Sequence, residues 1–347
     1  MIKQIDSTSL DTSIIIGNIL DDLHKFIKPD HILVVDENIN RIYGDYFKDH
    51  QIITVNTSEA GKTLETAEYI YNKLFDLNAH RKSVITGIGG GVLTDIAGFV
   101  ASTYMRGVEF NFVPTTLVAQ TDAAIGGKNG LNFCGIKNII GTVKQPKNIY
   151  IDRVFLETIP EKALASGFSE IIKTAMIGIP DLFYYLKEKA EFLQKLNEEF
   201  MNNILYETAK FKLEIVEKDQ YDSDLRKILN FGHTFGHAIE AEYSPNYYFS
   251  HGEAVSIGMR IALHFSKDMG YIDNKLVDES LDLMNKFDLS VDFRVDCKRL
   301  LKRLKKDKKV KGDEIDYIIL KDLGKAEIKS LPVSQLEDMC YAVPKYQ

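Results

Sequence analysis

The chain has 347 residues, of which 45% are hydrophobic and 27% are charged, and its formal net charge is −7. This composition is ordinary for a globular protein in water, and the length predicts two domains. The acidic balance argues against general nucleic-acid binding and against binding to anionic membranes.

The three cysteines, Cys134, Cys297 and Cys340, lie far apart and form no CxxC pair. We therefore expect a reducing compartment, no disulfide framework and no thiolate metal site. The N-terminal segment carries acids and hydroxyls where a signal peptide has a basic start, and no apolar run approaches the roughly 20 residues that span a bilayer. We expect a cytoplasmic protein.

Short apolar runs rich in β-branched residues recur through the first 150 residues, and each predicts a strand. They cover residues 31–35, 51–55, 83–86, 109–113 and 148–151. Between the second and third runs, residues 62–79 carry apolar side chains at helical spacing. Alternating strands and helices predict a mainly parallel sheet covered on both faces, with ligands bound where strands end and helices begin.

A glycine-rich junction, GIGGGVLTD (87–95), follows the third run and precedes a predicted apolar helix over 96–102. Glycines let backbone N–H groups close around a phosphate, which the positive end of the next helix also attracts. Because Val92 stands where GxGxxG has its third glycine, a tight turn without a ligand is the alternative. The three consecutive glycines at 89–91 indicate that some group approaches the backbone closely.

The segment 113–146 is long, glycine-rich and without clear periodicity, so we expect an irregular connection. Such connections inside compact domains are usually functional. The segment carries Asp122, Lys128, Lys137 and Asn138, and its lysines would suit a phosphate or a carboxylate. Solvated loop charges are the alternative.

From about residue 159 the pattern becomes helical. Glu170 and Lys173 lie three apart on one face of an apolar run, where a carboxylate is costly unless it is paired or bound to a metal. An amphipathic helical stretch follows over 183–218. The basic run at 298–311 predicts a solvated helix face in preference to a nucleic-acid site.

Histidines concentrate in residues 229–253. His233 and His237 are four apart in a segment with helical apolar spacing, so both rings project from one face, and Gly232 and Gly236 leave space beside them. His251 adds a third imidazole at the predicted start of the next helix. Imidazoles bind zinc and related ions, with a carboxylate from elsewhere completing the site. We favour a metal site over a structural pair of histidines.

Several motifs stand in the order seen in the 3-dehydroquinate synthases of the shikimate pathway: GGGVLTDIAGF, YMRG, VPTTL, TDAAIGGK, KNIIG, LASGFSEIIK, LNFGHTFGHAIEAE and HGEAV. The chain resembles this family over roughly residues 36–310. The resemblance implies an α/β Rossmann-like domain that binds NAD (1–158) and a mainly α-helical domain (159–347) that binds a divalent metal and the substrate. Iron-containing alcohol dehydrogenases share this plan.

The resemblance also implies the chemistry. The family converts 3-deoxy-D-arabino-heptulosonate 7-phosphate to 3-dehydroquinate and phosphate, a lyase reaction. The implied metal is zinc, with cobalt as the alternative, and the implied assembly is a homodimer without nucleic-acid or membrane partners.

Site residues carry over position by position. The implied metal ligands are Glu170, His233 and His251, which moves His237 from the ligands to the substrate, as a proton shuttle. The implied NAD contacts are Asp36, Asn38, Glu59, Lys62, Gly90, Gly91, Val92, Asp95, Thr115 and Thr116, and Asp122, Lys128, Lys137 and Asn138 match positions that hold nicotinamide and substrate. The implied substrate contacts are Lys173, Lys212, Arg226, Asn230 and His237, with Arg106 supplied by a neighbouring subunit and one of Lys308 and Lys309 as a further phosphate contact.

The chain departs from the family pattern at Thr94, Ile136, Gln220 and Asp224, which leaves another sugar phosphate cyclase as the first alternative. A polyol dehydrogenase of the glycerol dehydrogenase type is the second, although an uncharged polyol needs no cluster of lysine and arginine. A non-catalytic protein that kept the fold is the third, and the intact set of ligands and cations argues against it.

Overall fold

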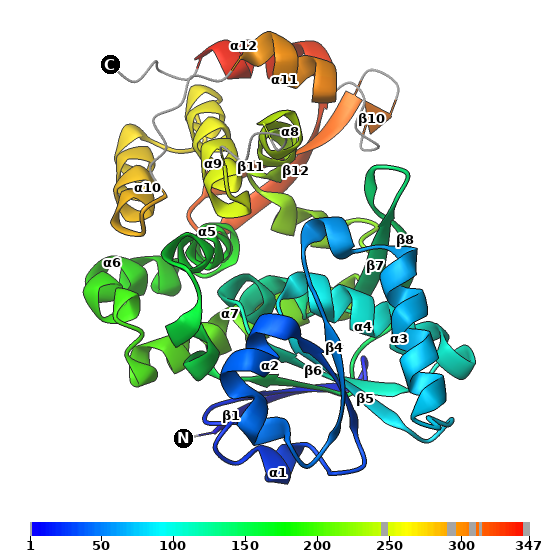
Figure 1. Ribbon diagram of the computed structural model, residues 1–347. Helices are drawn as coiled ribbons and strands as arrows, with labels where there is room; N and C mark the ends of the chain where they lie inside the picture. The colour runs from blue at the N-terminus through cyan, green and yellow to red at the C-terminus, as the bar shows by residue number, and fades with distance from the viewer. Residues whose placement is uncertain (1, 244–248, 290–295, 305–309, 312–313, 343–347) are drawn as a thin grey trace. The chain divides into compact units, whose positions relative to one another are not determined.

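The computed structural model describes residues 2–243, 249–289, 296–304, 310–311 and 314–342 (Figure 1). Contacts between residues divide the chain into two compact units. Unit 1 comprises Met1–Ile159 and Glu198–Tyr221, and unit 2 comprises Pro160–Asn197 and Asp222–Gln347. The functional domains expected at 1–158 and 159–347 stay a prediction; the contacts add the helix at 198–218 to the N-terminal unit.

Unit 1 is built on a seven-stranded sheet in the order β1-β2-β9-β6-β5-β3-β4. Neighbouring strands are parallel, except that β1 and β2 pair antiparallel. The strands are β1 (Lys3–Ser7), β2 (Thr12–Ile16), β3 (Ile32–Asp36), β4 (Gln51–Val55), β5 (Val84–Gly89), β6 (Glu109–Pro114) and β9 (Asn148–Ile151). The predicted parallel sheet is confirmed, whereas β1 and β2 were not predicted.

The helices of unit 1 connect these strands or pack against them. They are α1 (Leu23–Phe26), α2 (Glu37–Tyr43), α3 (Leu64–Asp76), α4 (Gly91–Thr103) and α7 (Glu198–Lys218). The helix predicted over 62–79 begins after Thr63, whose side chain accepts a hydrogen bond from the Thr66 backbone N–H and so caps α3. Strand β5 runs three residues beyond its predicted end, because Gly87, Ile88 and Gly89 still pair with β6. Gly87 also allows α4 to pack closely, since a Cβ there would lie 2.9 Å from the Ala97 Cβ.

The segment 113–146 is more regular than expected, and that prediction was wrong. A π-helical turn (Ala119–Ala123) is followed by an antiparallel hairpin of β7 (Lys128–Phe133) and β8 (Ile136–Val143). The two backbones approach closely, since a Cβ on Gly141 would lie 2.5 Å from the Asn129 carbonyl oxygen. Most of β8 is exposed, so no alternation of apolar and polar residues marks this hairpin in the sequence.

Unit 2 is mainly helical, as predicted, and it also contains a three-stranded antiparallel sheet that was not predicted. Its elements are α5 (Glu161–Gly178), α6 (Pro180–Gln194), α8 (His233–Tyr243), α9 (His251–Asp268), α10 (Asn274–Lys286), α11 (Cys297–Leu304), β10 (Val310–Lys311), β11 (Glu314–Asp322), β12 (Lys325–Pro332) and α12 (Val333–Ala342). The helical stretch predicted over 183–218 is two helices, α6 and α7. Leu196 interrupts it with a left-handed backbone (φ 54°).

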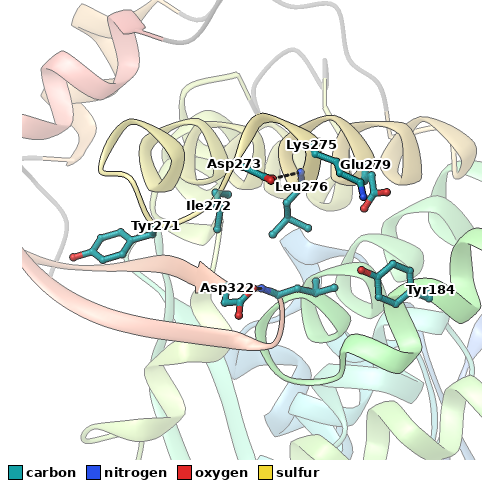
Figure 2. A pocket seen from close by; sticks show the side chains of 9 residues that line it. Tyr184, Tyr271, Ile272, Asp273, Lys275, Leu276, Glu279 and Asp322 are labelled. Atoms are coloured by element: carbon teal, nitrogen blue, oxygen red, sulfur yellow. Dashed lines mark hydrogen bonds between the residues drawn. The ribbon is translucent and has the colours of Figure 1, made fainter.

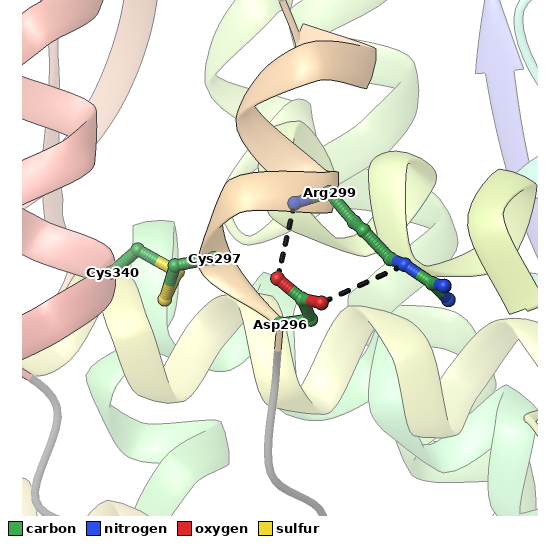
Figure 3. Close-up of a disulfide and its surroundings, with 4 residues drawn as sticks. All are labelled: Asp296, Cys297, Arg299 and Cys340. Carbon is green, nitrogen blue, oxygen red and sulfur yellow. Dashed lines mark hydrogen bonds and ion pairs between the residues drawn. A yellow bond between two sulfur atoms is a disulfide. The ribbon is translucent and has the colours of Figure 1, made fainter.

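A disulfide joins Cys297, the first residue of α11, to Cys340 in α12 (Figure 3). The two Cα atoms are 5.8 Å apart, within the usual range for a disulfide, and both side chains are buried. The expectation of no disulfide was therefore wrong. Spacing along the chain does not reveal that α11 and α12 pack together. Cys134 is free and exposed at the β7–β8 turn.

The basic run forms a solvated helix face as far as it is described. In α11, Lys298, Arg299 and Lys302 are exposed, while Leu300 and Leu304 are buried. Residues 305–309, which include Lys308 and Lys309, lie outside the described residues. Among the described helices, none is both long enough and apolar enough to cross a membrane.

Candidate active site: a Glu-His-His cluster and a glycine-rich junction

Three side chains from three helices of unit 2 form a candidate metal centre. Glu170 lies in α5, His233 is the first residue of α8, and His251 is the first residue of α9. One ligand atom from each lies within 4.8 Å of the other two. Glu170 Oε1 is 3.5 Å from His233 Nε2 and 3.2 Å from His251 Nε2, so both rings face the same carboxylate oxygen.

The opposite side of each group has its own partner. Lys173 Nζ contacts Glu170 Oε2, the oxygen that does not face the rings. His233 Nδ1 lies 3.1 Å from the backbone carbonyl of Phe231, and His251 Nδ1 lies 3.2 Å from Glu240 Oε2. Because these oxygens only accept hydrogen bonds, each Nδ1 carries a proton, and Nε2 of each ring faces the centre of the cluster.

The electrostatics of the cluster favour a cation. Burial alone would raise the pKa of Glu170, but Lys173, His233 and His251 hold this pKa well below its usual value, so the carboxylate is ionised. Burial lowers the pKa of His233 far below its usual value. Burial also lowers the pKa of His251, but hydrogen bonds to Glu170 and Glu240 outweigh it and raise this pKa to about 10. A metal cation bound in the cluster could therefore replace the proton that His251 carries on Nε2.

The glycines around the histidines serve helix packing. A Cβ on Gly232 would lie 2.5 Å from Met259 Cγ, and one on Gly236 would lie 3.0 Å from Val255 Cα. On the facing helix, a Cβ on Gly258 would lie 1.8 Å from the Gly232 carbonyl oxygen. The expected space beside the rings is therefore filled by α9, and this close packing brings His233 and His251 together.

The remaining predicted residues of unit 2 lie on elements next to the cluster residues in the chain. His237, one turn after His233, places its ring centroid 5.1 Å from that of His233 and 6.2 Å from that of His251. Arg226 and Asn230 lie on the 3-10 helix Leu225–Asn230, which precedes α8. Lys173 and Arg226 are buried, at 1% and 4% exposure, which is unusual for cations.

In unit 1, the glycine-rich junction connects β5 to α4. Gly90 is the N-cap of α4 and its position carries no side-chain cap, so the first N–H groups of the helix remain available to an anion. A Cβ on Gly90 would lie 3.1 Å from Thr116 Cγ2, and one on Gly91 would lie 3.1 Å from Ala123 Cβ. The segment after β6, through Thr116 and Ala123, is therefore one of the groups that approach the glycine backbone closely.

Other predicted residues gather at the carboxyl ends of the same parallel strands. Asp36 ends β3 and caps α2 by accepting hydrogen bonds from the Asn38 and Ile39 backbone N–H groups, at 2.8 and 3.2 Å. Thr115 and Thr116 follow β6, and Val92 and Asp95 lie in the first turns of α4. Neighbouring parallel strands end at one edge of the sheet, which explains how residues so distant in sequence meet.

The buried Lys62 contacts two of the other residues predicted for this site. Lys62, 4% exposed, contacts Asp95 and lies 2.6 Å from Asn138 Oδ1. Burial raises the pKa of Asp95 to about 6, although Lys62 opposes the shift. Asn132 links the same group, since its amide donates to Glu59 Oε1 at 2.8 Å and its Oδ1 accepts from the Asn138 N–H at 3.0 Å. No pattern in the sequence identified Asn132.

The four remaining predicted cations are placed differently from one another. Lys212 of α7 is buried and lies 2.6 Å from Asp122 Oδ1. Lys128 begins β7 and is exposed, and Lys137, 3.9 Å from Glu59, is exposed on β8. Arg106 is exposed at the end of a short 3-10 helix, with a left-handed backbone (φ 71°).

A hollow of about 370 Å³ in unit 2 is lined by none of the predicted site residues (Figure 2). Its lining comes from Tyr184 of α6, the start of α10 and the β11–β12 turn.

Glu240, the partner of His251, was not predicted from the sequence. Its position seven residues after His233, two helical turns along the same face, was the available signal.

A parallel α/β unit with an uncapped glycine-rich junction, and a helical unit with a carboxylate–imidazole cluster, define a class of enzymes that includes sugar phosphate cyclases and iron-containing alcohol dehydrogenases. A 2-epi-5-epi-valiolone synthase from Streptomyces hygroscopicus subsp. jinggangensis 5008, solved with NAD⁺ and Zn²⁺ bound, superposes with a TM-score of 0.87 and 25% identity, covering 98% of each chain. An iron-containing alcohol dehydrogenase shares the fold, with a TM-score of 0.64 and 12% identity over 95% of this chain and 96% of that one. The expected fold class is confirmed.

Sequence comparison narrows the class to one family. The family models for the N-terminal and C-terminal domains of 3-dehydroquinate synthase match residues 52–166 and 167–310. A 3-dehydroquinate synthase from Thermoanaerobacter pseudethanolicus is 39% identical over 283 residues, which cover 81% of this chain and 79% of the relative. The chain belongs to the 3-dehydroquinate synthase family.

Proposed function

We propose that this chain is a carbon–oxygen lyase that converts 3-deoxy-D-arabino-heptulosonate 7-phosphate to 3-dehydroquinate and phosphate, using NAD and a divalent metal. The observation that carries the proposal is the cluster of Glu170, His233 and His251 with buried Lys173 behind it, in a chain whose two halves both match the family.

The donor set fits zinc, with cobalt as the alternative. Two imidazole nitrogens and one carboxylate oxygen are common ligands of catalytic zinc, and three protein ligands leave further positions for substrate. Because Lys173 contacts Glu170 Oε2, the carboxylate offers only Oε1 to a metal. The cation would supply Lewis-acid polarisation of a substrate oxygen.

The glycine-rich junction supports the NAD proposal. The uncapped N–H groups of α4, with Gly90, Gly91 and Val92, suit a pyrophosphate, and Asp36 and Asn38 end the neighbouring strand, where nucleotide ligands bind in such sheets. NAD would accept a hydride from the substrate and return it later, so the reaction consumes no net NAD. The other proposed contacts are Glu59, Lys62, Asp95, Thr115, Thr116, Asp122, Lys128 and Lys137.

The buried cations support an anionic substrate. Burying a charge is costly unless it is compensated, and Lys173 and Lys212 are compensated by Glu170 and Asp122. We propose that Lys173, Lys212 and Arg226 orient the carboxylate and phosphate of the substrate, since ammonium and guanidinium groups bind such anions through charge-assisted hydrogen bonds. Asn230 and Asn138 would orient its hydroxyls.

His237 is the proposed proton shuttle. Its ring lies beside both cluster histidines without belonging to the ligand set, and an imidazole titrates near neutral pH. It would move a proton between substrate and solvent while the other residues hold the substrate in place.

The decisive test supplies the purified chain with the heptulosonate phosphate, NAD and zinc. A 3-dehydroquinate synthase releases phosphate without net NADH and forms a product with the mass and NMR spectrum of 3-dehydroquinate. Turnover of a different sugar phosphate alone would identify another cyclase. Steady NADH formation with glycerol would identify a polyol dehydrogenase.

Two of the departures from the family pattern lie in described parts of unit 1. Thr94 is buried in α4, where its hydroxyl donates to the Gly91 carbonyl at 3.0 Å, and Ile136 is exposed on the hairpin.

We also propose a homodimer in which Arg106 of one subunit contacts the substrate phosphate of the other. Its exposed position supports this role. Arg106→Ala and Lys173→Ala should each be inactive alone, whereas mixing the two after subunit exchange should restore about a quarter of wild-type activity, because half the dimers then hold one intact site. No recovery would contradict a shared site.

We place the enzyme in the cytoplasm, since its phosphorylated substrate does not cross membranes freely.

A further inference from the structure

The two histidines of the candidate metal centre have unlike partners. His233 Nδ1 faces a neutral backbone carbonyl, that of Phe231, at 3.1 Å. His251 Nδ1 faces a carboxylate, that of Glu240, at 3.2 Å. An imidazole whose Nδ1–H donates to a carboxylate becomes a stronger donor at Nε2 than one bonded to a carbonyl. The two rings are therefore expected to bind a cation with different strength.

Glu240 also fixes the direction of the His251 ring. The ring is contacted from both sides, by Glu240 Oε2 at Nδ1 and by Glu170 Oε1 at Nε2, each at 3.2 Å. This restraint matters because the His251 side chain is 33% exposed, whereas those of His233 and Glu170 are 9% and 2% exposed. Burial restricts the two buried ligands, which also have partners in Phe231 and Lys173, whereas the more exposed ring depends mainly on its hydrogen bonds.

Helix α8 couples the two histidines. It begins with His233 and carries Glu240 two turns later, so one helix supplies one ligand and orients another that lies on α9. We infer that Glu240 is a positioning residue that holds His251 with Nε2 directed at the metal and increases its affinity for a divalent cation. This inference rests on the proposed metal site.

The chain offers a matched control in Glu242. It lies on the same helix, its side chain is 22% exposed like that of Glu240, and it faces a cation, Arg299, at 4.0 Å. A general effect of removing an acid from α8 would appear in both alanine variants. An effect on His251 would appear only in Glu240→Ala.

The experiment measures Zn²⁺ affinity by competition with a chromophoric chelator in the wild type, Glu240→Ala, Glu240→Gln and Glu242→Ala. We expect Glu240→Ala to lose about 10- to 100-fold in affinity. Glu240→Gln, which keeps an accepting oxygen, should recover much of the loss, and Glu242→Ala should match the wild type. In ¹⁵N-histidine NMR spectra of the zinc-loaded protein, the His251 Nδ1–H signal should shift only in the Glu240 variants. Circular dichroism melting of the metal-free proteins controls for folding.

Zinc affinity of Glu240→Ala within twofold of the wild type would overturn the inference while leaving the proposed function intact. An equal loss in Glu242→Ala would also overturn it, because the helix and not the contact would then be responsible. A wild-type chain that binds no zinc would instead refute the metal site, and with it the proposed function.

Discussion

The contact between α8 and α9 should control the metal centre, and Gly258→Ala tests this directly. A Cβ at this position would lie 1.8 Å from the Gly232 carbonyl oxygen, whereas ordinary contacts begin near 3.4 Å. The helices would have to separate by about 1.6 Å, the difference between these two distances. The obstacle is backbone, which cannot rotate away as a side chain can. Overpacking of this kind costs about 3 kcal/mol, the upper end of the usual range.

A separation of that size also disturbs the ligands. His233 begins α8 and His251 begins α9, so their Nε2 atoms would move apart, while metal–ligand distances tolerate only about 0.2 Å. We therefore expect Gly258→Ala to lose zinc binding and to melt about 6 to 12 °C below the wild type. Differential scanning calorimetry with and without zinc, together with metal analysis, measures both effects.

Gly270→Ala is the matched control. Gly270 follows the end of α9 with a left-handed backbone (φ 76°), and a Cβ there would meet nothing within 4 Å. This variant should lose only about 1 kcal/mol of stability, from backbone strain, and should keep its zinc. The reasoning is refuted if Gly258→Ala binds zinc as tightly as the wild type and melts within about 2 °C of it.

Three further predictions concern other parts of the molecule. His251→Ala should lose metal and activity together while keeping NAD binding, as metal analysis and calorimetric titration would show; a variant that stays loaded and active would disprove the ligand assignment. Replacing Cys297 and Cys340 by serine should lower the free energy of unfolding of unit 2 by about 4 kcal/mol, because the disulfide closes a loop of 43 residues. Dithiothreitol should produce the same loss in the wild type and none in the double variant, and equal stability of all forms would show that the bond does not form. Asp95, whose pKa burial raises to about 6, contributes stability that is fully present below its unfolded value of 3.8 and is lost as pH rises through 6. The stability of the wild type relative to Asp95→Asn should therefore fall by up to about 3 kcal/mol between pH 3.8 and 7 in urea titrations, and a difference independent of pH would contradict the shift.

Local patterns in the sequence predicted much of the fold. Each apolar run of the first 150 residues is a strand of the parallel sheet, because strands buried on both faces have few polar positions; β3 is buried along its whole length. The glycine-rich segment was predicted to connect a strand to a helix, and Gly90 is the N-cap of α4 there. The paired histidines of α8 project together because helical spacing alone determines their common face.

Tertiary structure decided what packs against those patterns. Helical spacing left His233 and His237 as equal candidates for metal ligation until the family resemblance singled out Glu170, His233 and His251. The packing of α5, α8 and α9 brings these three side chains together. The same packing explains Gly232 and Gly236, fills the space expected beside the rings and places Glu240 behind His251. The disulfide, the β7–β8 hairpin and the sheet of β10, β11 and β12 were equally hidden, since each joins segments through contacts that periodicity does not encode. A sequence pattern reports which side of an element is buried; the partner that buries it is determined by the fold as a whole.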